Sequence, residues 1–325
     1  MLQAPHKPAA ARAPLLPPAM LATLAVFATL PFWIKGVGLY PYLGVEVMIW
    51  VIYALGFNLL LGYAGLPSFG HGAYFGVGAY AFGLVQLSFS SNLWICLAAA
   101  VVAGALAGGL VGAFISHRRG IYYALLTIAF GQIFWFVAIK WHSVTRGEDG
   151  LLNIKRGAAF GVPLDQLENL YYFCFALFVL VVLVLWRLVH SPFGRVLAAI
   201  RQNETRARFL GYNVWLYKWL AFAVSALVAG LAGGLFALAQ QSAYPNVMSL
   251  HQSGFVVMMT LVGGGLVSFW GPVLGAALFF LARDLLGAYT EAWLLWYGLL
   301  FMLIVLFKPE GLAGLLSHVR SRASA

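Results

Sequence analysis

Charged side chains are scarce in this chain, and their scarcity excludes most kinds of soluble protein. Only 9% of the 325 residues are Asp, Glu, Lys or Arg, whereas 63% are hydrophobic and the mean hydropathy is +0.90. Soluble domains carry about 25% charged residues. The composition therefore places the chain in a lipid bilayer. The formal net charge of +10 does not point to nucleic acid, because no segment resembles a basic nucleic-acid-binding face, and we expect no such partner.

Cysteines and catalytic motifs are also scarce. Cys96 and Cys174 are the two cysteines, and both lie in apolar runs without the spacing of a metal or redox pair, so we expect them to pack in the core. The sequence contains no Gly-x-x-x-x-Gly-Lys-Ser/Thr loop and no His-Glu-x-x-His motif. Its few carboxylates form no pair within an apolar segment. We therefore expect no catalytic residue, no cofactor and no metal, which argues against an intramembrane enzyme.

Apolar segments follow one another along most of the chain. A membrane-spanning helix needs about 20 mainly apolar residues. On that measure the expected spans lie near 15–35, 42–61, 67–88, 92–115, 121–140, 169–190, 213–240, 254–269, 272–288 and 290–307. The pattern predicts an all-α polytopic membrane protein of about 8–10 transmembrane helices in a single domain over 1–325. The Gly-rich segment 67–88 and the pair 254–288, broken at Gly271-Pro272, are the candidates for re-entrant or discontinuous helices.

Basic residues gather on one side of the expected spans. With the N-terminus inside and ten crossings, 13 of the 19 Lys and Arg residues fall in cytoplasmic segments. This bias follows the positive-inside rule. We therefore expect cytoplasmic tails over 1–14 and 308–325 and a periplasmic loop over 141–168. Glu46 is the acidic residue expected one or two turns inside a span, near its outer end, where a hydrated structural role competes with a functional one.

The stretch 191–211 is polar and strongly basic although it lies between two apolar segments. Ser191 fits a helix N-cap, Pro192 fits the first helical position and Gly211 fits the position just past the end. The apolar side chains that would share one helical face are Val196, Ala199, Ile200, Ala207 and Leu210, interrupted by Asn203. The pattern predicts one amphipathic helix at the membrane surface, suited to docking a soluble partner. A solvated helix that only joins two spans fits the same pattern.

Polar residues also occur at the expected depth of the membrane. Asn58, Ser68, His71 and Gly72 combine polar groups with a flexible backbone in the Gly-rich region. Unpaired polar groups in lipid cost several kcal/mol each, so we expect these residues to face a partner subunit or a path through the membrane. Packing between helices of the chain is the alternative. For His71 by itself, we expect a buried, hydrogen-bonded histidine.

Glycines recur at four-residue spacing in several apolar segments. The pairs and triples are Gly72 with Gly76, Gly104 with Gly108 and Gly112, Gly230 with Gly234, and Gly271 with Gly275. Such spacing lets helix backbones approach closely in lipid. We expect close packing at these positions. The run 263–265 consists of three glycines, which weaken a helix considerably, and we expect a helix break or hinge there.

Six segments in a fixed order carry a resemblance that covers nearly the whole chain. They are Asn58 to Tyr80, Arg119 to Thr127, Thr145 to Leu151, the stretch 191–211, Gly263 to Ala276 and Phe307 to Leu312. Together they resemble the LivM-type permeases of branched-chain amino acid ATP-binding-cassette importers. Two positions depart from the family pattern: Arg146 stands where the family often has glycine, and Pro67 is unusual before Ser68. The first departure leaves the detail of the outer loop open.

The resemblance implies a multi-pass permease subunit of the bacterial inner membrane with no ATPase of its own. It implies as partners a second homologous permease (LivH-like), two cytoplasmic ATPase subunits and a periplasmic substrate-binding protein. The stretch 191–211 then corresponds to the coupling helix that fits a groove on an ATPase. Glu204, Ala207 and Gly211 resemble, in a loosened form, the Glu-Ala-Ala…Gly pattern of importer permeases. The residues expected at the ATPase contact are Arg195, Asn203, Glu204, Arg206, Ala207 and Gly211.

The cargo that the resemblance implies is a branched-chain, hydrophobic amino acid. The central depth of the spans is almost free of charge, which suits a zwitterion, but small neutral amides fit the same argument. A related permease for urea, short amides or aromatic acids is therefore an alternative. An ion-coupled secondary transporter is the rival from another class, although such carriers usually place charged groups at the midplane. A channel is disfavoured because no filter motif is repeated.

Overall fold

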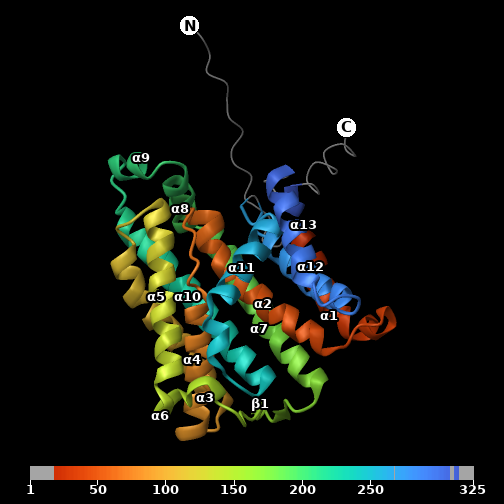
Figure 1. Cartoon of the computed structure of the whole chain (residues 1–325). Coiled ribbons are helices and arrows are strands. Elements are labelled where there is room, and N and C mark those ends of the chain that lie inside the picture. The colour runs from red at the N-terminus through yellow and green to blue at the C-terminus, as the bar shows by residue number, and fades with distance from the viewer. Residues whose placement is uncertain (1–17, 267, 308–310, 315–325) are drawn as a thin grey trace, which may run out of the picture.

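The chain folds into a bundle of helices, shown in Figure 1 from a computed structural model that describes residues 18–266, 268–307 and 311–314. The α-helices are α1 (Pro18–Trp33), α2 (Tyr42–Asn58), α3 (Gly72–Ser88), α4 (Leu93–Ile115), α5 (Gly120–Lys140), α6 (His142–Thr145), α7 (Leu167–His190), α8 (Pro192–Gln202), α9 (Glu204–Phe209), α10 (Val214–Gln240), α11 (Leu250–Gly263), α12 (Gly271–Gly287) and α13 (Trp293–Phe307). Shorter helical segments are η1 (Ile34–Val37), η2 (Leu59–Ala64), η3 (Gly147–Asp149) and η4 (Pro245–Met248), and the strands β1 (Ala158–Ala159) and β2 (Val162–Pro163) form a small hairpin. The all-α prediction is confirmed. The expected tail 1–14 and most of the expected tail 308–325 lie outside the described residues.

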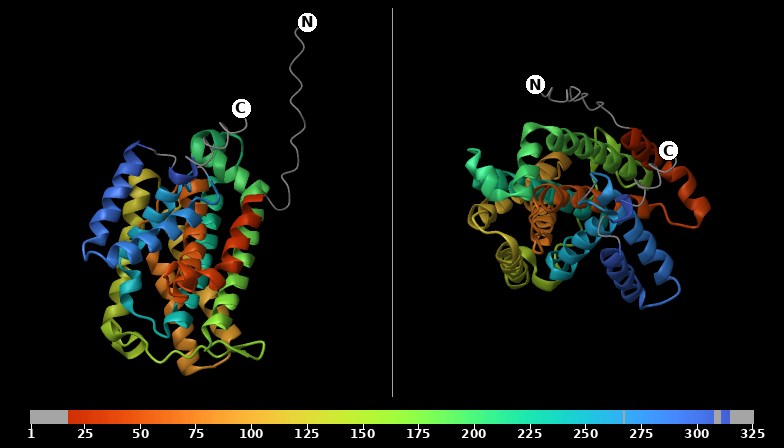
Figure 2. Two further views of the ribbon diagram at one scale, coloured as in Figure 1. Left: turned by 90° about the vertical axis from the view of Figure 1, so that its right-hand side faces the viewer. Right: turned by 90° about the horizontal axis from the view of Figure 1, so that it is seen from above.

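Long apolar helices form the body of the bundle. Among the described residues, five helices are long and apolar enough to cross a membrane: Tyr42–Ala64, which joins α2 and η2, Leu93–Ile115, Gly120–Lys140, Leu167–His190 and Val214–Gln240. The helices α2 and α10 are the most buried of the five, whereas 28% of the apolar stretch of α5 and 33% of that of α7 are buried. Seen from above, the green α7 and the blue α13 lie on opposite outer edges (Figure 2). The exposed faces are apolar, as contact with lipid or another membrane subunit requires.

The two ends of the bundle carry different structural elements. One end carries α8 and α9, and we call it the coupling end; the other carries α6 and β1, and we call it the loop end (Figure 1). The expected outer segment 141–168 forms short turns at the loop end, where Leu151 pairs with Ala243. Arg146 adopts a left-handed backbone conformation there (φ 62°). This conformation favours glycine, which accounts for the glycine that the family often has at this position.

Glycines bring α3, α4 and α10 into backbone contact. A Cβ atom on Gly104 of α4 would lie 2.7 Å from the carbonyl oxygen of Ala226 and 2.8 Å from the Cα of Gly230, both on α10. A Cβ atom on Gly78 of α3 would overlap the backbone of Gly230. The expected close packing at Gly104 and Gly230 is therefore confirmed, since any side chain at these positions would hold the helices apart.

The helix α3 begins inside the bundle, after a segment over 65–71 that has no regular helical structure. The backbone N–H of Gly72, at the start of α3, donates to the Ser253 hydroxyl of the first turn of α11 at 2.9 Å, and both residues are buried. The expected span 67–88 was thus wrong at its start, because α3 begins at Gly72. The expected span 254–269 was wrong at both ends, because α11 runs over Leu250–Gly263 and stops at Gly264, which has a φ of 89°. Irregular backbone of this kind is tolerated where protein surrounds it.

An ion pair joins α2 and α12. Both terminal nitrogens of Arg283 donate to the carboxylate of Glu46, each at 2.8 Å, and the Arg283 Nε donates to Asp284 at 3.1 Å. A bidentate pair of this geometry is among the stronger polar contacts in proteins. Arg283 is thereby the structural partner of Glu46, and no feature of the sequence predicted this pairing.

Candidate functional site

The basic stretch between α7 and α10 forms two short helices at the coupling end. α8 ends at Gln202, and Asn203 adopts an extended conformation (φ −159°, ψ 102°). The Asn203 side chain then accepts a hydrogen bond from the backbone N–H of Arg206 at 2.9 Å and caps α9. The prediction of one helix over 191–211 was wrong, because an asparagine side chain offers the backbone this alternative to continued helix. Pro192 at the start of α8 and the positive φ of Gly211 (87°) are confirmed.

One face of the two helices packs inward. Val196 and Ile200 of α8 are buried together with Ala207 of α9 and Val214 of α10. Leu210, expected on the same face, is instead 69% exposed, because the break at Asn203 changes the direction of the chain. The helix pair is therefore seated on α10 by a small apolar cluster.

Glu204 ties the helix pair to the rest of the coupling end. Its carboxylate lies 3.5 Å from Arg119 Nε, before α5, and 3.7 Å from Lys218 Nζ on α10. It also lies 3.4 Å from Arg208 within α9. The Lys218 side chain is completely buried and donates a further hydrogen bond, of 2.5 Å, to the carbonyl oxygen of Arg118. A buried ammonium needs such partners, so Glu204 links α9 to α10 and to the α4–α5 turn.

The opposite face of the helix pair is exposed. Arg195 and Arg206 lie on this face, and Phe209 and Leu210 at the end of α9 are 87% and 69% exposed. Large apolar side chains beside cations, at the basic end of a membrane protein, are typical of a docking surface. Of the residues expected at an ATPase contact, Arg195 and Arg206 are available to a partner. Asn203, Ala207 and Gly211 shape α9 itself, and their docking role stays a prediction.

The polar residues expected near a membrane path are buried within the chain. All four lie in the interior: Asn58, Ser68, His71 and Gly72. Asn58 is 1% exposed, and Ser68 and His71 are completely buried. The buried, hydrogen-bonded His71 is confirmed. A role for these four residues in lining a path stays a prediction. In this conformation they pack between helices.

The hydrogen bonds of His71 define its tautomer. Ser225 donates its single hydroxyl hydrogen to the carbonyl oxygen of Gly56 at 2.7 Å. The 2.9 Å contact between Ser225 Oγ and His71 Nε2 therefore has the imidazole as donor. His71 Nδ1 is then left to accept from Ser68 Oγ at 3.4 Å. The imidazole is neutral, with its proton on Nε2, and it cross-links α10 to the segment before α3.

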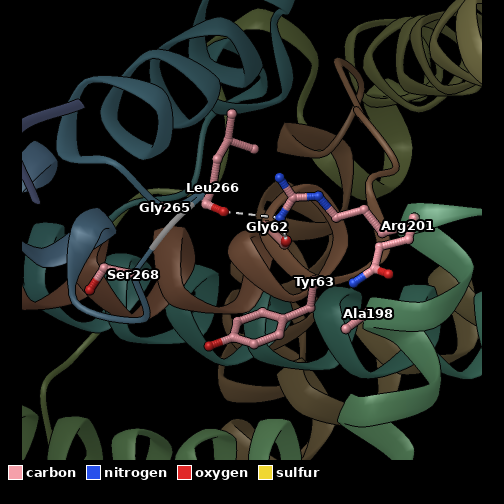
Figure 3. Close-up of a pocket in the computed structure, with 8 residues that line it drawn as sticks. Gly62, Tyr63, Ala198, Arg201, Gly265, Leu266 and Ser268 are labelled. Atoms are coloured by element: carbon pink, nitrogen blue, oxygen red, sulfur yellow. Dashed lines mark hydrogen bonds between the residues drawn. The ribbon is translucent and has the colours of Figure 1, made fainter. Parts of the chain in front are cut away.

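Arg201 of α8 is exposed, yet its guanidinium bonds two segments that are distant in sequence, and the sequence did not single it out. Its Nη1 donates to the carbonyl oxygens of Gly62 and Leu266, the latter at 3.0 Å. Figure 3 shows the guanidinium between the two segments that carry these carbonyls. Arg201 and these segments line a cavity of about 410 Å³ that also contains Tyr63 and Ser268. No local pattern distinguishes Arg201 from its neighbouring arginines, since its partners are distant in sequence.

Comparisons with known proteins agree on one family. Residues 41–308 match the family described as "Branched-chain amino acid transport system / permease component". The high-affinity branched-chain amino acid transport system permease protein LivM of Salmonella typhimurium is 30% identical over 316 residues, which cover 90% of this chain and 74% of the relative. LivM of Escherichia coli is 32% identical over 288 residues, covering 82% and 68%. The guanosine ABC transporter permease protein NupQ of Bacillus subtilis is 26% identical over 222 residues, covering 63% and 67%. No solved structure matches the chain.

Proposed function

The chain belongs to the family of branched-chain amino acid transport permeases, and we propose that it is a permease subunit of an ATP-binding-cassette importer. In this proposal it forms, with a second related permease, the path for branched-chain amino acids through the bacterial inner membrane. Two cytoplasmic ATPases drive transport, and a periplasmic binding protein delivers the cargo. The chain itself is a transport subunit and carries out no hydrolysis.

The helix pair α8–α9 is the observation that carries this proposal. It presents arginines and the exposed side chains of Phe209 and Leu210 at the basic end of the bundle. Its inner face is joined to α10 by an apolar cluster and by Glu204. A partner that binds the outer face can therefore move α10 and the α4–α5 turn together with the helix pair.

Such movement supports a mechanism of alternating access. When the ATPases close around ATP, the helix pair moves with them, and the helices joined to it tilt relative to the second permease. The bundle then exchanges between outward-open and inward-open states, as in other proteins that change state by rigid movement of packed helices. The free energy comes from the partner subunits, in accordance with the absence of a nucleotide-binding loop from the sequence.

The cargo is inferred from the relatives and from the charge distribution. The two bacterial LivM relatives belong to high-affinity branched-chain amino acid systems. In this chain Arg283 pairs with Glu46 and Asp284, and Glu204 pairs with Lys218 and Arg119 at the coupling end. A zwitterion with an aliphatic side chain suits a permease whose buried charged groups are engaged with one another in this way.

Reconstitution tests the proposal directly. The chain is co-purified with the second permease and the ATPases, placed in lipid vesicles and supplied with the binding protein and radiolabelled leucine. We expect uptake that requires ATP and every subunit. Gradient-driven uptake by this chain alone would instead identify a secondary transporter. Exchange of the binding protein for one with another ligand preference should change the cargo; an unchanged cargo would indicate a selective site in the permease.

A further inference from the structure

Two helix ends meet below α8. The first is the end of α2, continued by η2 and terminated by Gly65 with a left-handed φ of 69°. The second is the end of α11, terminated by Gly264 with a φ of 89°. The last carbonyl groups of a helix have no partner within the helix, and the helix dipole makes this end partially negative. The last turn of α11 is capped by its own backbone, because the N–H groups of Gly264 and Gly265 donate to Leu261 and Thr260. The carbonyl groups of Gly62 and Leu266 instead accept from a side chain.

Arg201 supplies that donor from outside the bundle. Its Nη1 bridges the carbonyl oxygens of Gly62, in η2, and Leu266, just after α11 (Figure 3). Its stem lies against Gly65, where a Cβ atom would be 2.9 Å from Arg201 Cγ. Gly65 thus leaves room for the arginine to reach across. A single side chain of α8 therefore bridges η2 and the segment just after α11.

Within the described residues, no backbone–backbone hydrogen bond joins the two helix ends to each other. We call residues 58–65 and 263–266 together the seam. Asn58 Oδ1 lies between Gly62 and Gly265, yet among the described residues neither polar atom of its amide has a hydrogen-bond partner. A buried amide without hydrogen-bond partners destabilises the closed seam. Water can supply the missing hydrogen bonds when the seam opens. The two segments touch through backbone atoms, since a Cβ atom on Gly62 would lie 2.5 Å from the carbonyl oxygen of Gly265. The cavity of about 410 Å³ lies beside this contact and is also lined by Ala198 and Arg201 of α8.

We infer that Arg201 is a positioning residue that transmits movement of α8 to the seam, so that the seam opens when α8 is displaced. The inference rests on the proposed function, since it assigns a consequence to ATPase-driven movement of the helix pair. In the closed seam, Arg201 bridges the Gly62 and Leu266 carbonyls from α8. Displacement of α8 releases the Gly62 and Leu266 carbonyls, and the exposed Asn58 amide then gains water. The unsatisfied Asn58 thereby lowers the free energy of the opened seam relative to the closed one.

The experiment uses the assembled complex in lipid vesicles and compares Arg201→Ala and Arg201→Lys with the parent. Arg187→Ala is the matched control, because Arg187 is an exposed arginine of the last turn of α7 at the same end. The first measurement is the amount of leucine imported per ATP hydrolysed. The second is the rate at which a Ser268→Cys thiol, which lines the cavity, reacts with a maleimide. The native Cys96 and Cys174 are buried and give little background.

We expect Arg201→Ala to lower import per ATP and to raise the Ser268→Cys labelling rate, each by about tenfold, as loss of a charge-assisted hydrogen bond predicts. Arg201→Lys should change both by about threefold, because an ammonium lacks the planar fork of the guanidinium. Arg187→Ala should match the parent. If Arg201→Ala does not assemble, Arg201→Lys decides by the same two measurements.

Three results would overturn the inference. Parent-like labelling in the Arg201 variants would show that the seam does not depend on this residue. Parental rates of both import and hydrolysis would show that transmission does not depend on it. Equal losses of import and hydrolysis would assign Arg201 to ATPase docking instead. If the parent complex shows no ATP-dependent import, the proposed function fails, while the labelling rates still decide whether Arg201 holds the seam.

Discussion

Glu204 of α9 lies 3.7 Å from Lys218 of α10, and the lysine side chain is completely buried. Within the described residues, the Lys218 ammonium donates its hydrogen bond to the carbonyl oxygen of Arg118, and Glu204 supplies the counter-charge. The carboxylate that the family resemblance placed at a partner surface therefore has an internal role. It joins the helix pair to α10, so a partner that moves α9 also moves a central helix of the bundle.

Replacement of Glu204 should destabilise the chain. In Glu204→Gln the buried ammonium loses its counter-charge, and we expect a loss of about 1–3 kcal/mol in the free energy of unfolding. The double variant Glu204→Gln with Lys218→Met should recover part of this loss, because it removes the unpaired charge. Unfolding of the purified chain in detergent measures both. The control is Glu168→Gln, an exposed carboxylate of α7; equal destabilisation by the control would contradict the buried pair.

Two glycines on α4 should respond differently to the same substitution. Gly104 faces the backbone of α10, whereas Gly109 has open space where its Cβ would be. Gly104→Ala should lower stability by about 1–3 kcal/mol through overpacking. Gly109→Ala should be neutral or stabilise by up to about 1 kcal/mol, since alanine favours the helix. Thermal unfolding of the two variants side by side is the measurement, and identical behaviour would refute the close contact between α4 and α10.

The tautomer of His71 should be visible by NMR. Because Ser225 donates to Gly56, His71 must carry its proton on Nε2. We expect a nitrogen-15 spectrum with a protonated, pyrrole-like Nε2 and an unprotonated, pyridine-like Nδ1. The signals are assigned by their loss in His71→Gln. In Ser225→Ala the imidazole loses this acceptor, and the Nε2 signal should move. A protonated Nδ1 in the parent protein would contradict the hydrogen-bond assignment.

Thiol labelling should define the orientation of the bundle. Thr205 of α9 and Lys155 of the loop-end segment are both exposed and lie at opposite ends. With a membrane-impermeant reagent, Lys155→Cys should react in intact cells and Thr205→Cys only in inverted vesicles. The buried Cys96 and Cys174 leave the unmodified chain as a low-background control. Reaction of Thr205→Cys from the outside would reverse the whole topology.

Local features of the fold were predicted well from the sequence. The start of α8 at Pro192, the left-handed Gly211 and the helix end within 263–265 agree with the structure. Each of these depends on side chains and backbone preferences within a few residues. The break at Asn203 was missed because asparagine is compatible with both a helix interior and a cap. The seating of α9 on α10, which the structure shows, decides in favour of the cap.

The candidate site was predicted only in part, for a related reason. The sequence marked 191–211 as a basic amphipathic stretch, yet it did not distinguish the inward Glu204 from the outward Arg206. It omitted Arg201 and Lys218, whose partners Gly62, Leu266 and Arg118 lie between 65 and 139 residues away. Contacts over such separations leave no periodic signal in the chain.

What the sequence determined by itself is therefore the class of the protein: an apolar, helical membrane subunit with one basic amphipathic segment and no nucleotide-binding loop. Hydropathy and helical periodicity depend on each residue and its near neighbours, so they can be read without a fold. What only the tertiary structure decided is which polar groups meet. It brought Arg201 to two helix ends, Glu204 to Lys218 and His71 to Ser225, because a buried polar group must find a partner and the packing of distant helices determines which one is within reach.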